Sequence, residues 1–216
     1  SDNTHTRGSP VDSRLRPLHQ VTGSAGLASM LLIFVPAIAR SGLEPSFGGS
    51  SADVVEFLKS IQSPLDNLGS FIMTVGLIAF LWFIIGLSVL LAKAEGDLPW
   101  RSAIAAASGL LLLALALAAN TEAAAFRAAD IDPQIARYAF DEGNLSFANG
   151  WVALGSFALC AGWVVTSTRT LPRWLGWWAI ASGIGMALSR AIWTSELWLL
   201  PYAAFWLWVA SSCIVL

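Results

Sequence analysis

Residues 77–92 read LIAFLWFIIGLSVLLA and contain no charged side chain, which makes them the clearest indication of how this chain folds. They form the centre of a longer apolar run at residues 68–92, and about 20 such residues span the hydrocarbon core of a bilayer as a helix. The apolar residues follow one another without alternation, which favours a helix over a strand of a membrane barrel. Because a helix satisfies its own backbone groups in lipid, the run predicts a transmembrane helix.

The composition of the whole chain agrees with a lipid environment. Of its 216 residues, 56% are hydrophobic and only 12% are charged. A soluble domain carries about 25% charged residues, so this chain lacks the polar surface that would cover a globule in water. Its net charge of −2 argues against a nucleic-acid partner. The lipid bilayer is therefore the predicted surrounding.

Five further apolar runs meet or approach the spanning length. They lie at residues 23–39, 103–119, 145–168, 174–189 and 197–216. The sequence thus predicts an all-α, polytopic transmembrane bundle of about six spans, forming a single domain at residues 23–216. The polar N-terminal tail at residues 1–22 is predicted to be disordered, and Pro36 predicts a kink near the end of the first span.

The positions of lysine and arginine predict the orientation of the bundle. Lys93 and Arg101 flank one short loop, and Arg169 and Arg173 lie in another, which favours the cytoplasmic side for both. Both termini are then cytoplasmic, with seven basic residues on the inner side and five on the outer side.

Two longer segments connect the spans on the predicted outer side. The first contains SSADVVEFLKSIQS at residues 50–63, which predicts an amphipathic helix capped by Ser50 or Ser51. Its apolar face consists of Val54, Val55, Leu58 and Ile61. The second contains the cap Asp132 and predicts a short helix at residues 133–140. Both helices are expected to lie on the membrane surface or to fold back over the bundle.

Several catalytic and cofactor-binding arrangements are missing from the sequence. The two histidines, His5 and His19, lie in the N-terminal tail, and no predicted span contains a lysine. This excludes haem held by two histidines in the spans, a zinc-protease helix and a retinal Schiff base. No cofactor and no metal is therefore expected. The span centres also lack ionisable residues, which lowers the expectation of an ion-coupled transporter.

Polar side chains gather where the predicted spans 3 to 6 meet the outer surface, and these are the candidate ligand-binding residues. They are Asn120, Glu122, Arg127, Asp141, Asn144, Asn149, Arg190 and Glu196. If the spans are adjacent, these groups line an outward-facing cleft with charges of both signs. The alternative is ordinary capping and ion pairing at helix ends, including a pair between Arg190 and Glu196 across their turn.

Small residues recur at helical spacing in the fourth and fifth spans. They are Gly155 and Gly162 in one, and Gly176, Ala179, Gly183 and Ala187 in the other. Such stripes let helices approach closely in lipid, either within the chain or in a homo-oligomer or larger membrane complex. Trp82, Trp206 and Trp208 lie deeper than the other tryptophans, where they either line a pocket for an apolar ligand or pack in the core.

The stretch LPRWLGWW at residues 171–178, followed by ASGIG at residues 181–185, resembles a signature of one family. The family consists of uncharacterised bacterial polytopic membrane proteins, common in actinobacteria, with a domain of unknown function of six or seven helices. The resemblance implies a location in the cytoplasmic membrane of a bacterium. It implies no activity, so no functional residue is carried over.

Three functions remain open at this point. The first is a non-enzymatic membrane protein, either an accessory or scaffold subunit or a binder of an apolar or lipid-like ligand. The alternative is a transporter or channel for small solutes, in which Asn149, Ser156 and Cys160 form a polar stripe. A third is an enzyme or sensor at the outer surface, with Glu122, Asp141 and Glu142 as acids or bases.

Overall fold

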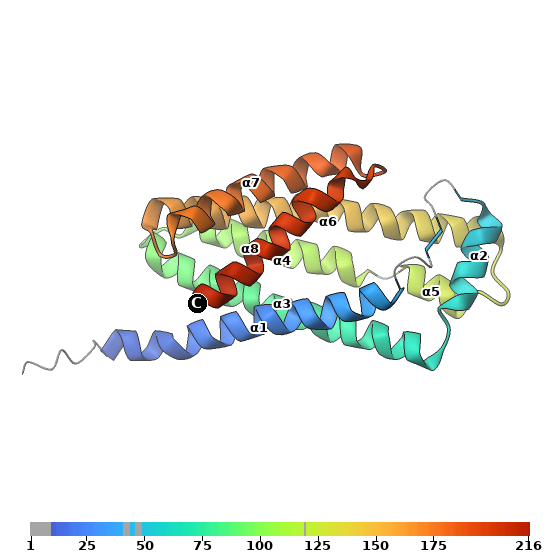
Figure 1. Cartoon of the computed structure of the whole chain (residues 1–216), viewed down its shortest axis with the longest axis horizontal. Helices are drawn as coiled ribbons and strands as arrows, with labels where there is room; N and C mark the ends of the chain where they lie inside the picture. The colour runs from blue at the N-terminus through green and yellow to red at the C-terminus, as the bar shows by residue number, and fades with distance from the viewer. Residues whose placement is uncertain (1–9, 41–43, 46–48, 119) are drawn as a thin grey trace, which may run out of the picture.

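A computed structural model describes residues 10–40, 44–45, 49–118 and 120–216, leaving out the side chains of residues 10–15 and 120. The described residues contain helices and no strand. Six helices run along the bundle (Figure 1). They are α1 (Pro10–Arg40), α3 (Pro64–Glu95), α4 (Trp100–Leu117), α6 (Pro133–Thr168), α7 (Arg173–Ser189) and α8 (Leu199–Val215). The predicted all-α membrane bundle is confirmed in this architecture.

Five helical segments have the length and hydropathy needed to cross a membrane within the described ranges. They contain α1, α3, α4, α6 and α8. Helix α7 has 17 residues, which is the lower limit for a spanning helix, and it packs along α6. The six helices lie at the positions of the six predicted spans, and five of them meet the length and hydropathy of a membrane span.

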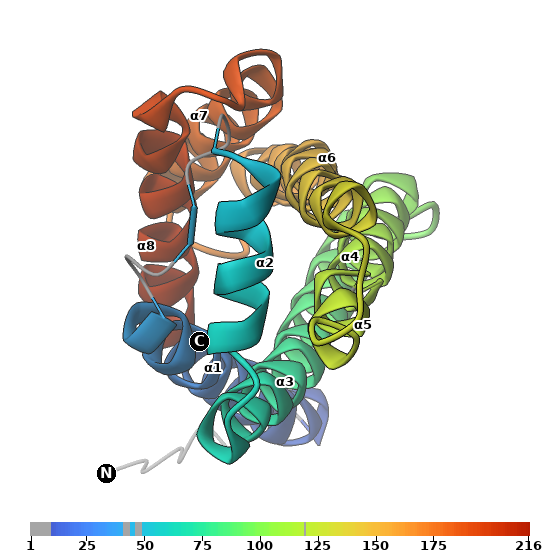
Figure 2. The same ribbon diagram turned by 90° about the vertical axis from the view of Figure 1, so that its right-hand side faces the viewer.

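The two ends of the bundle differ. The end that carries α2 (Ser51–Ser60) and α5 (Asn120–Phe126) is called the cap end, and it lies on the right in Figure 1. The other end carries the start of α1, the C-terminus and the short α3–α4 and α6–α7 turns, and is called the terminal end. Figure 2 looks onto the cap end, where α2 lies across the middle of the bundle.

Helices α1, α3 and α6 are longer than the predicted spans. Helix α1 begins at Pro10, so residues 10–22 are helical where a disordered tail was expected, while residues 1–9 lie outside the described part. The same helix continues past Pro36 to Arg40. Proline is tolerated in a membrane helix because neighbouring groups satisfy the carbonyl that it leaves free.

Helix α6 is one continuous helix where the sequence predicted two, and that prediction was wrong. Asp132 caps it as expected, by accepting hydrogen bonds from the backbone of Gln134 and Ile135. No proline follows Pro133 in the helix, and Gly143 alone is too weak a breaker to end it. Its 36 residues extend to about 54 Å, well beyond the roughly 30 Å of a hydrocarbon core.

Helix α2 folds back over the bundle at the cap end. Ser50 is its N-cap and forms a capping box with Asp53, which resolves the predicted choice between Ser50 and Ser51. Val54 and Leu58 are fully buried as predicted, and Phe57 is buried beside them. They pack with apolar residues of α5 and of the first turns of α6 in a small second core.

We expect Ser50→Ala to loosen α2 without disturbing the bundle. The change removes the oxygen that accepts the Asp53 N–H at 3.2 Å, which costs about 1 kcal/mol for a lost cap. Hydrogen-exchange mass spectrometry should show faster exchange of the α2 amides and unchanged exchange in α7. Ser51→Ala is the matched control; equal acceleration in the two variants would contradict the assignment of Ser50 as the cap.

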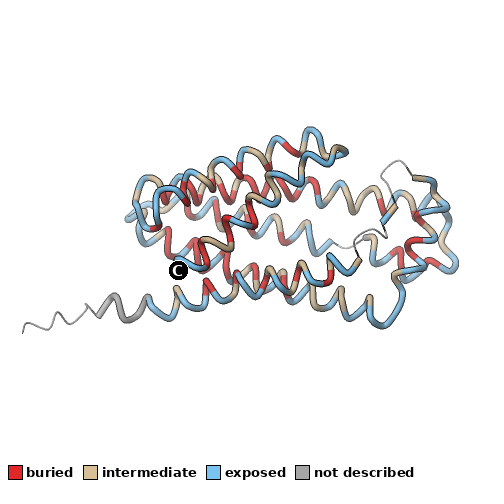
Figure 3. Tube along the Cα trace, in the orientation of Figure 1, coloured by how far each residue is buried: buried red, intermediate tan, exposed pale blue. Residues whose placement is uncertain are grey.

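The main core lies between the membrane helices, along the inward faces that Figure 3 colours as buried. Within it, five aromatic side chains form a closed layer that we call the floor. They are Phe80, Phe83, Phe157, Phe205 and Trp208, each at most 1% exposed. Phe157 contacts Phe83, Phe205 and Trp208 with ring centroids 6.5, 6.5 and 6.0 Å apart.

The stripes of small residues on α6 and α7 pack against each other. A Cβ atom added at Gly155 would lie 2.6 Å from the carbonyl oxygen of Gly183, and one at Gly162 would lie 2.5 Å from that of Gly176. The two backbones therefore meet where no side chain fits between them. Because this seam is filled within the chain, an oligomer would have to form through other surfaces.

A buried ion pair closes the α3–α4 turn at the terminal end. Arg101 Nε donates to Glu95 Oε1 at 2.8 Å, while the backbone N–H and the hydroxyl of Ser102 donate to Oε2. The guanidinium of Arg101 also donates to Ser167 and lies 5.3 Å from the centre of the Trp163 ring. This network joins the α3–α4 turn to the end of α6.

Candidate functional site

Three hollows meet at the cap end of the bundle. A central cavity of about 380 Å³ lies between α1, α3, α4, α6 and α8. A second hollow of about 420 Å³, called the mouth, lies between it and α2. The cavity and the mouth share Thr121, Gly143, Phe147 and Trp151 in their walls. A third hollow of about 440 Å³, called the side pocket, adjoins the mouth at Arg40, Ile61 and Glu122.

The central cavity is apolar and rich in aromatic rings. None of the described residues that line it is charged. Phe34 and Trp206 pack edge to face with centroids 5.1 Å apart, and Tyr202 lies 5.9 Å from Phe147. Phe80 belongs both to this wall and to the floor, so the cavity ends at the floor. Its volume falls in the range of small-molecule sites.

The mouth combines aromatic walls with a few polar groups. Trp151 and Trp198 stack with centroids 4.9 Å apart on one wall, and Phe57 and Phe140 meet at 6.0 Å on the α2 side. The polar lining residues are Arg40, Glu44, Thr121, Glu122 and Asn144. Glu44 is exposed as a whole residue, but desolvation of its carboxyl by the surrounding walls raises its pKa, and the positive charge of Arg40 opposes that shift.

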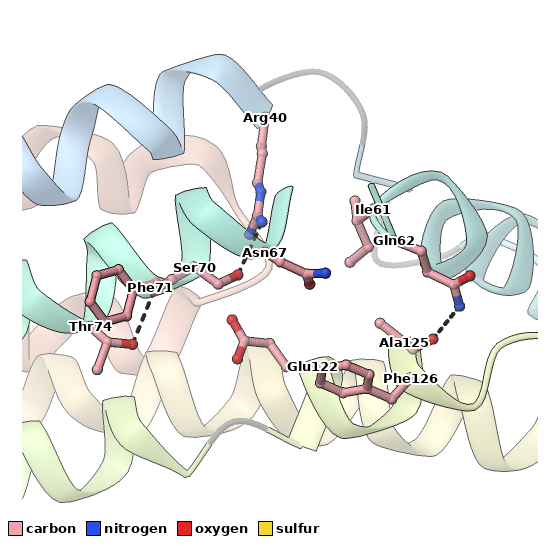
Figure 4. A pocket seen from close by; sticks show the side chains of 10 residues that line it. All are labelled: Arg40, Ile61, Gln62, Asn67, Ser70, Phe71, Thr74, Glu122, Ala125 and Phe126. Atoms are coloured by element: carbon pink, nitrogen blue, oxygen red, sulfur yellow. Dashed lines mark hydrogen bonds between the residues drawn. The ribbon is translucent and has the colours of Figure 1, made fainter. Parts of the chain in front are cut away.

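Arg40 is held on the wall of the side pocket by α3 (Figure 4). Its guanidinium donates to the Ser70 hydroxyl at 3.0 Å and to the backbone carbonyl of Asp66. Its Nε lies 3.6 Å from the Asp66 carboxylate. Glu122 points into the same pocket from the α5 side, and it forms no hydrogen bond or ion pair within the described ranges. A paired base and an unpaired acid thus line one opening.

Two indole N–H groups in the cavity wall are buried without an acceptor among the described residues. They belong to Trp151 and Trp206, which are 3% and 7% exposed. The Tyr202 hydroxyl lies near Trp206 Nε1, but the two groups do not form a hydrogen bond with good geometry. The Trp151 donor has no hydrogen-bond acceptor among the described residues. A buried donor in this state costs about 1–3 kcal/mol.

The structure brings together only part of the predicted cleft. Glu122 and Asn144 line the mouth. Arg127 and Glu196 are exposed and lie outside the walls of all three hollows, as far as the described residues define them. The side chain of Asn120 lies outside the described part of the structure.

The remaining predicted residues, Asp141, Asn149 and Arg190, form contacts outside the lining of the mouth. Arg190 Nε donates to Asn149 Oδ1 at 2.7 Å and its guanidinium lies 5.9 Å from the Trp193 ring, so its partner is Asn149 and not the expected Glu196. Asp141 accepts from Arg137 Nε at 3.0 Å, one turn away on α6. These contacts match the alternative of capping and pairing at helix ends.

The polar stripe of α6 does not face the central cavity. Ser156 pairs with Ser108 of α4 at 2.8 Å, and Asn149 binds Arg190 after α7. The α6 residues that do line the cavity include Phe147, Trp151 and Leu154, on another face of the helix. Ser156 thus lies between α6 and α4, while Asn149 is exposed and bound to Arg190.

Sequence reasoning missed most of the residues that line the mouth and the cavity. Arg40 is one of the five basic residues on the predicted outer side, and it was not among the candidate ligand-binding residues. Phe147 and Trp151 lie four residues apart on α6, and Tyr202 and Trp206 do so on α8, so each pair shares a helix face. This spacing of aromatic residues is the sequence feature that could have indicated an aromatic-lined site. Of the three deep tryptophans, Trp206 lines the cavity, Trp208 is in the floor, and Trp82 is 61% exposed.

The described residues contain no group of three or more His, Cys, Asp and Glu side chains placed to hold a metal ion. Comparison of the chain with protein-family models, curated proteins and solved structures found no match. The resemblance at residues 171–185 therefore stays a prediction, and the function has to be argued from the geometry.

Proposed function

We propose that this protein is a non-enzymatic membrane protein that binds a lipid-like amphiphile, with the tail in the central cavity and the head in the mouth. The observation that carries the proposal is the junction of the two hollows at Phe147 and Trp151. On one side of that junction the lining is uncharged and aromatic, and on the other it holds Arg40, Glu44 and Glu122.

This arrangement suits a molecule that has an apolar end and a polar end. An apolar chain in the cavity would gain the contacts that an empty apolar space lacks, at about 0.8 kcal/mol for each methylene removed from water. An ester, hydroxyl or phosphate oxygen near the junction would offer an acceptor to the Trp151 N–H, which has none among the described residues. The ligand would thus supply what the wall lacks.

The geometry favours a binder over the alternative of a solute transporter or channel. Phe80 of the floor lines the cavity, and the other four floor side chains, each at most 1% exposed, are packed with it, so a solute path through the bundle would have to pass this aromatic layer. The polar stripe that suggested a solute path does not face the cavity. On the predicted orientation, the mouth faces the outer side of the membrane, so the ligand would enter and leave there.

Filling the cavity is expected to abolish ligand binding. Leu112 lines the cavity, and Leu112→Trp adds an indole ring to it. Leu110 of the same helix is 49% exposed and outside the cavity wall, so Leu110→Trp is the matched control. Native mass spectrometry after gentle extraction should find a bound amphiphile on the wild type and the control, and at least tenfold less on Leu112→Trp.

The same spectra provide the contrary outcome. A wild-type protein that carries no amphiphile, even after incubation with a saturating excess of a long-chain detergent, would overturn the proposal. Equal occupancy of Leu112→Trp and Leu110→Trp would also do so, because the ligand would then lie on the lipid-facing surface.

A further inference from the structure

The charges at the mouth do not cancel, and this imbalance bears on which head group fits. Three charged residues line the mouth, of which Glu44 and Glu122 are acids and Arg40 is the base. Arg40 is already bound to Asp66 and Ser70 on the α3 side. Glu122 has no such partner among the described residues and points into the adjoining side pocket. The free charge at this opening is negative.

The aromatic rings of the mouth add a second preference of the same sign. The faces of aromatic rings carry partial negative charge and attract ammonium groups, most strongly where water is excluded. Phe147 lines both mouth and cavity and is still 45% exposed, so its ring is available for contact. Trp198 and Trp151 stack beside it, and Phe57 of α2 and Phe140 of α6 also line the mouth. Trp193 is set aside because the Arg190 guanidinium lies over its ring.

We infer that the mouth selects an amphiphile whose head group carries an ammonium, held between the aromatic walls and the Glu122 carboxylate. The inference rests on the proposed function, since it concerns the head of the molecule whose tail occupies the cavity. An ammonium with or without a neighbouring phosphate has the required chemistry. If the head group contains a phosphate, Arg40 on the mouth wall is placed to bind it. If it contains only the ammonium, Glu122 balances the positive charge of that ammonium.

The test compares four amphiphiles that share one dodecyl chain and differ in the head. Dodecyltrimethylammonium and dodecylphosphocholine carry an ammonium, dodecyl maltoside is uncharged, and dodecyl sulfate is anionic. The full chain is held in nanodiscs of an uncharged galactolipid, so that the bilayer itself neither attracts nor repels the probes, and empty nanodiscs give the blank. Isothermal titration then measures each dissociation constant.

The two ammonium amphiphiles are expected to bind about tenfold more tightly than the maltoside, and the sulfate more weakly than the maltoside. The gain of dodecylphosphocholine relative to dodecyltrimethylammonium reports whether a phosphate contributes. Glu122→Gln keeps the shape of the side chain and removes its charge, so it should weaken the ammonium probes roughly fivefold and leave the maltoside unchanged. Glu196→Gln, an exposed acid away from the mouth, is the matched control and should change neither.

The outcomes separate this inference from the proposed function. Tight binding of all four heads, or tightest binding of the sulfate, overturns the ammonium preference and leaves the cavity as the binding site. An unchanged ammonium affinity in Glu122→Gln overturns the role of that carboxylate. If no probe binds above the empty nanodiscs, the proposed function itself fails.

Discussion

Arg101→Ala is expected to lower the free energy of unfolding by about 3 kcal/mol, because it leaves the buried Glu95 carboxylate without its cation. The side chain of Glu95 is only 2% exposed, and that of Arg101 is 17% exposed. The hydrogen bonds from Ser102 persist in the variant, so Glu95 keeps part of its stabilisation. Unfolding followed by sodium dodecyl sulfate titration measures the difference.

Two further variants identify the cause of that loss. Arg173→Ala removes an exposed arginine at the start of α7, and it should change the stability by less than about 0.5 kcal/mol. The double variant Glu95→Leu with Arg101→Leu removes both charges and should recover most of the lost stability. A double variant as unstable as Arg101→Ala alone would show that the packing of Arg101 over Trp163, and not the unpaired charge, was responsible.

Gly183→Leu is expected to force α6 and α7 apart and to lower the thermal stability of the bundle strongly. A Cβ atom at Gly183 would lie 2.8 Å from the carbonyl oxygen of Gly155 and 3.0 Å from the backbone nitrogen of Leu159. Backbone atoms cannot turn aside as the end of a flexible side chain can, so the helices must move apart. Overpacking of this kind costs about 3 kcal/mol or more.

The comparison for this variant comes from the same helix. Ala181 lies two residues away on the exposed face of α7, so Ala181→Leu adds a side chain of the same size into lipid. Intrinsic fluorescence during heating should show a loss of more than about 5 °C in the midpoint for Gly183→Leu and little change for Ala181→Leu. Similar midpoints for the two variants would contradict the close seam.

The membrane spans could be predicted from the sequence because hydrophobic length alone identifies them, and the capping signal of α2 is local to Ser50 and Asp53. The continuity of α6 could not be predicted in the same way. The stretch at residues 141–144 is polar and resembles a loop, although it contains no strong helix breaker. Composition indicates where a chain leaves the lipid, but a helix need not end there.

The cavity was harder to predict for a geometrical reason. Trp151 lies on α6 and Trp206 on α8, far apart in the chain, and each looks like an ordinary core residue by itself. Only the packing of five helices leaves a space between them. The candidate polar residues were placed at the correct end of the bundle, but which face each occupies depends on helix rotation. For this reason Glu122 reached the mouth and Asn149 reached Arg190.

The length of α6 has a consequence for how the protein responds to its surroundings. A helix of about 54 Å is longer than the roughly 30 Å of a hydrocarbon core, so with the predicted span at residues 145–168 in the membrane its first turns are expected to lie outside that core, together with α2 and α5. A change in membrane thickness would shift the position of the membrane surface along α6. It would not change the contacts that hold α2 and α5 against the first turns of α6. We therefore expect the mouth to keep its shape in membranes of different thickness.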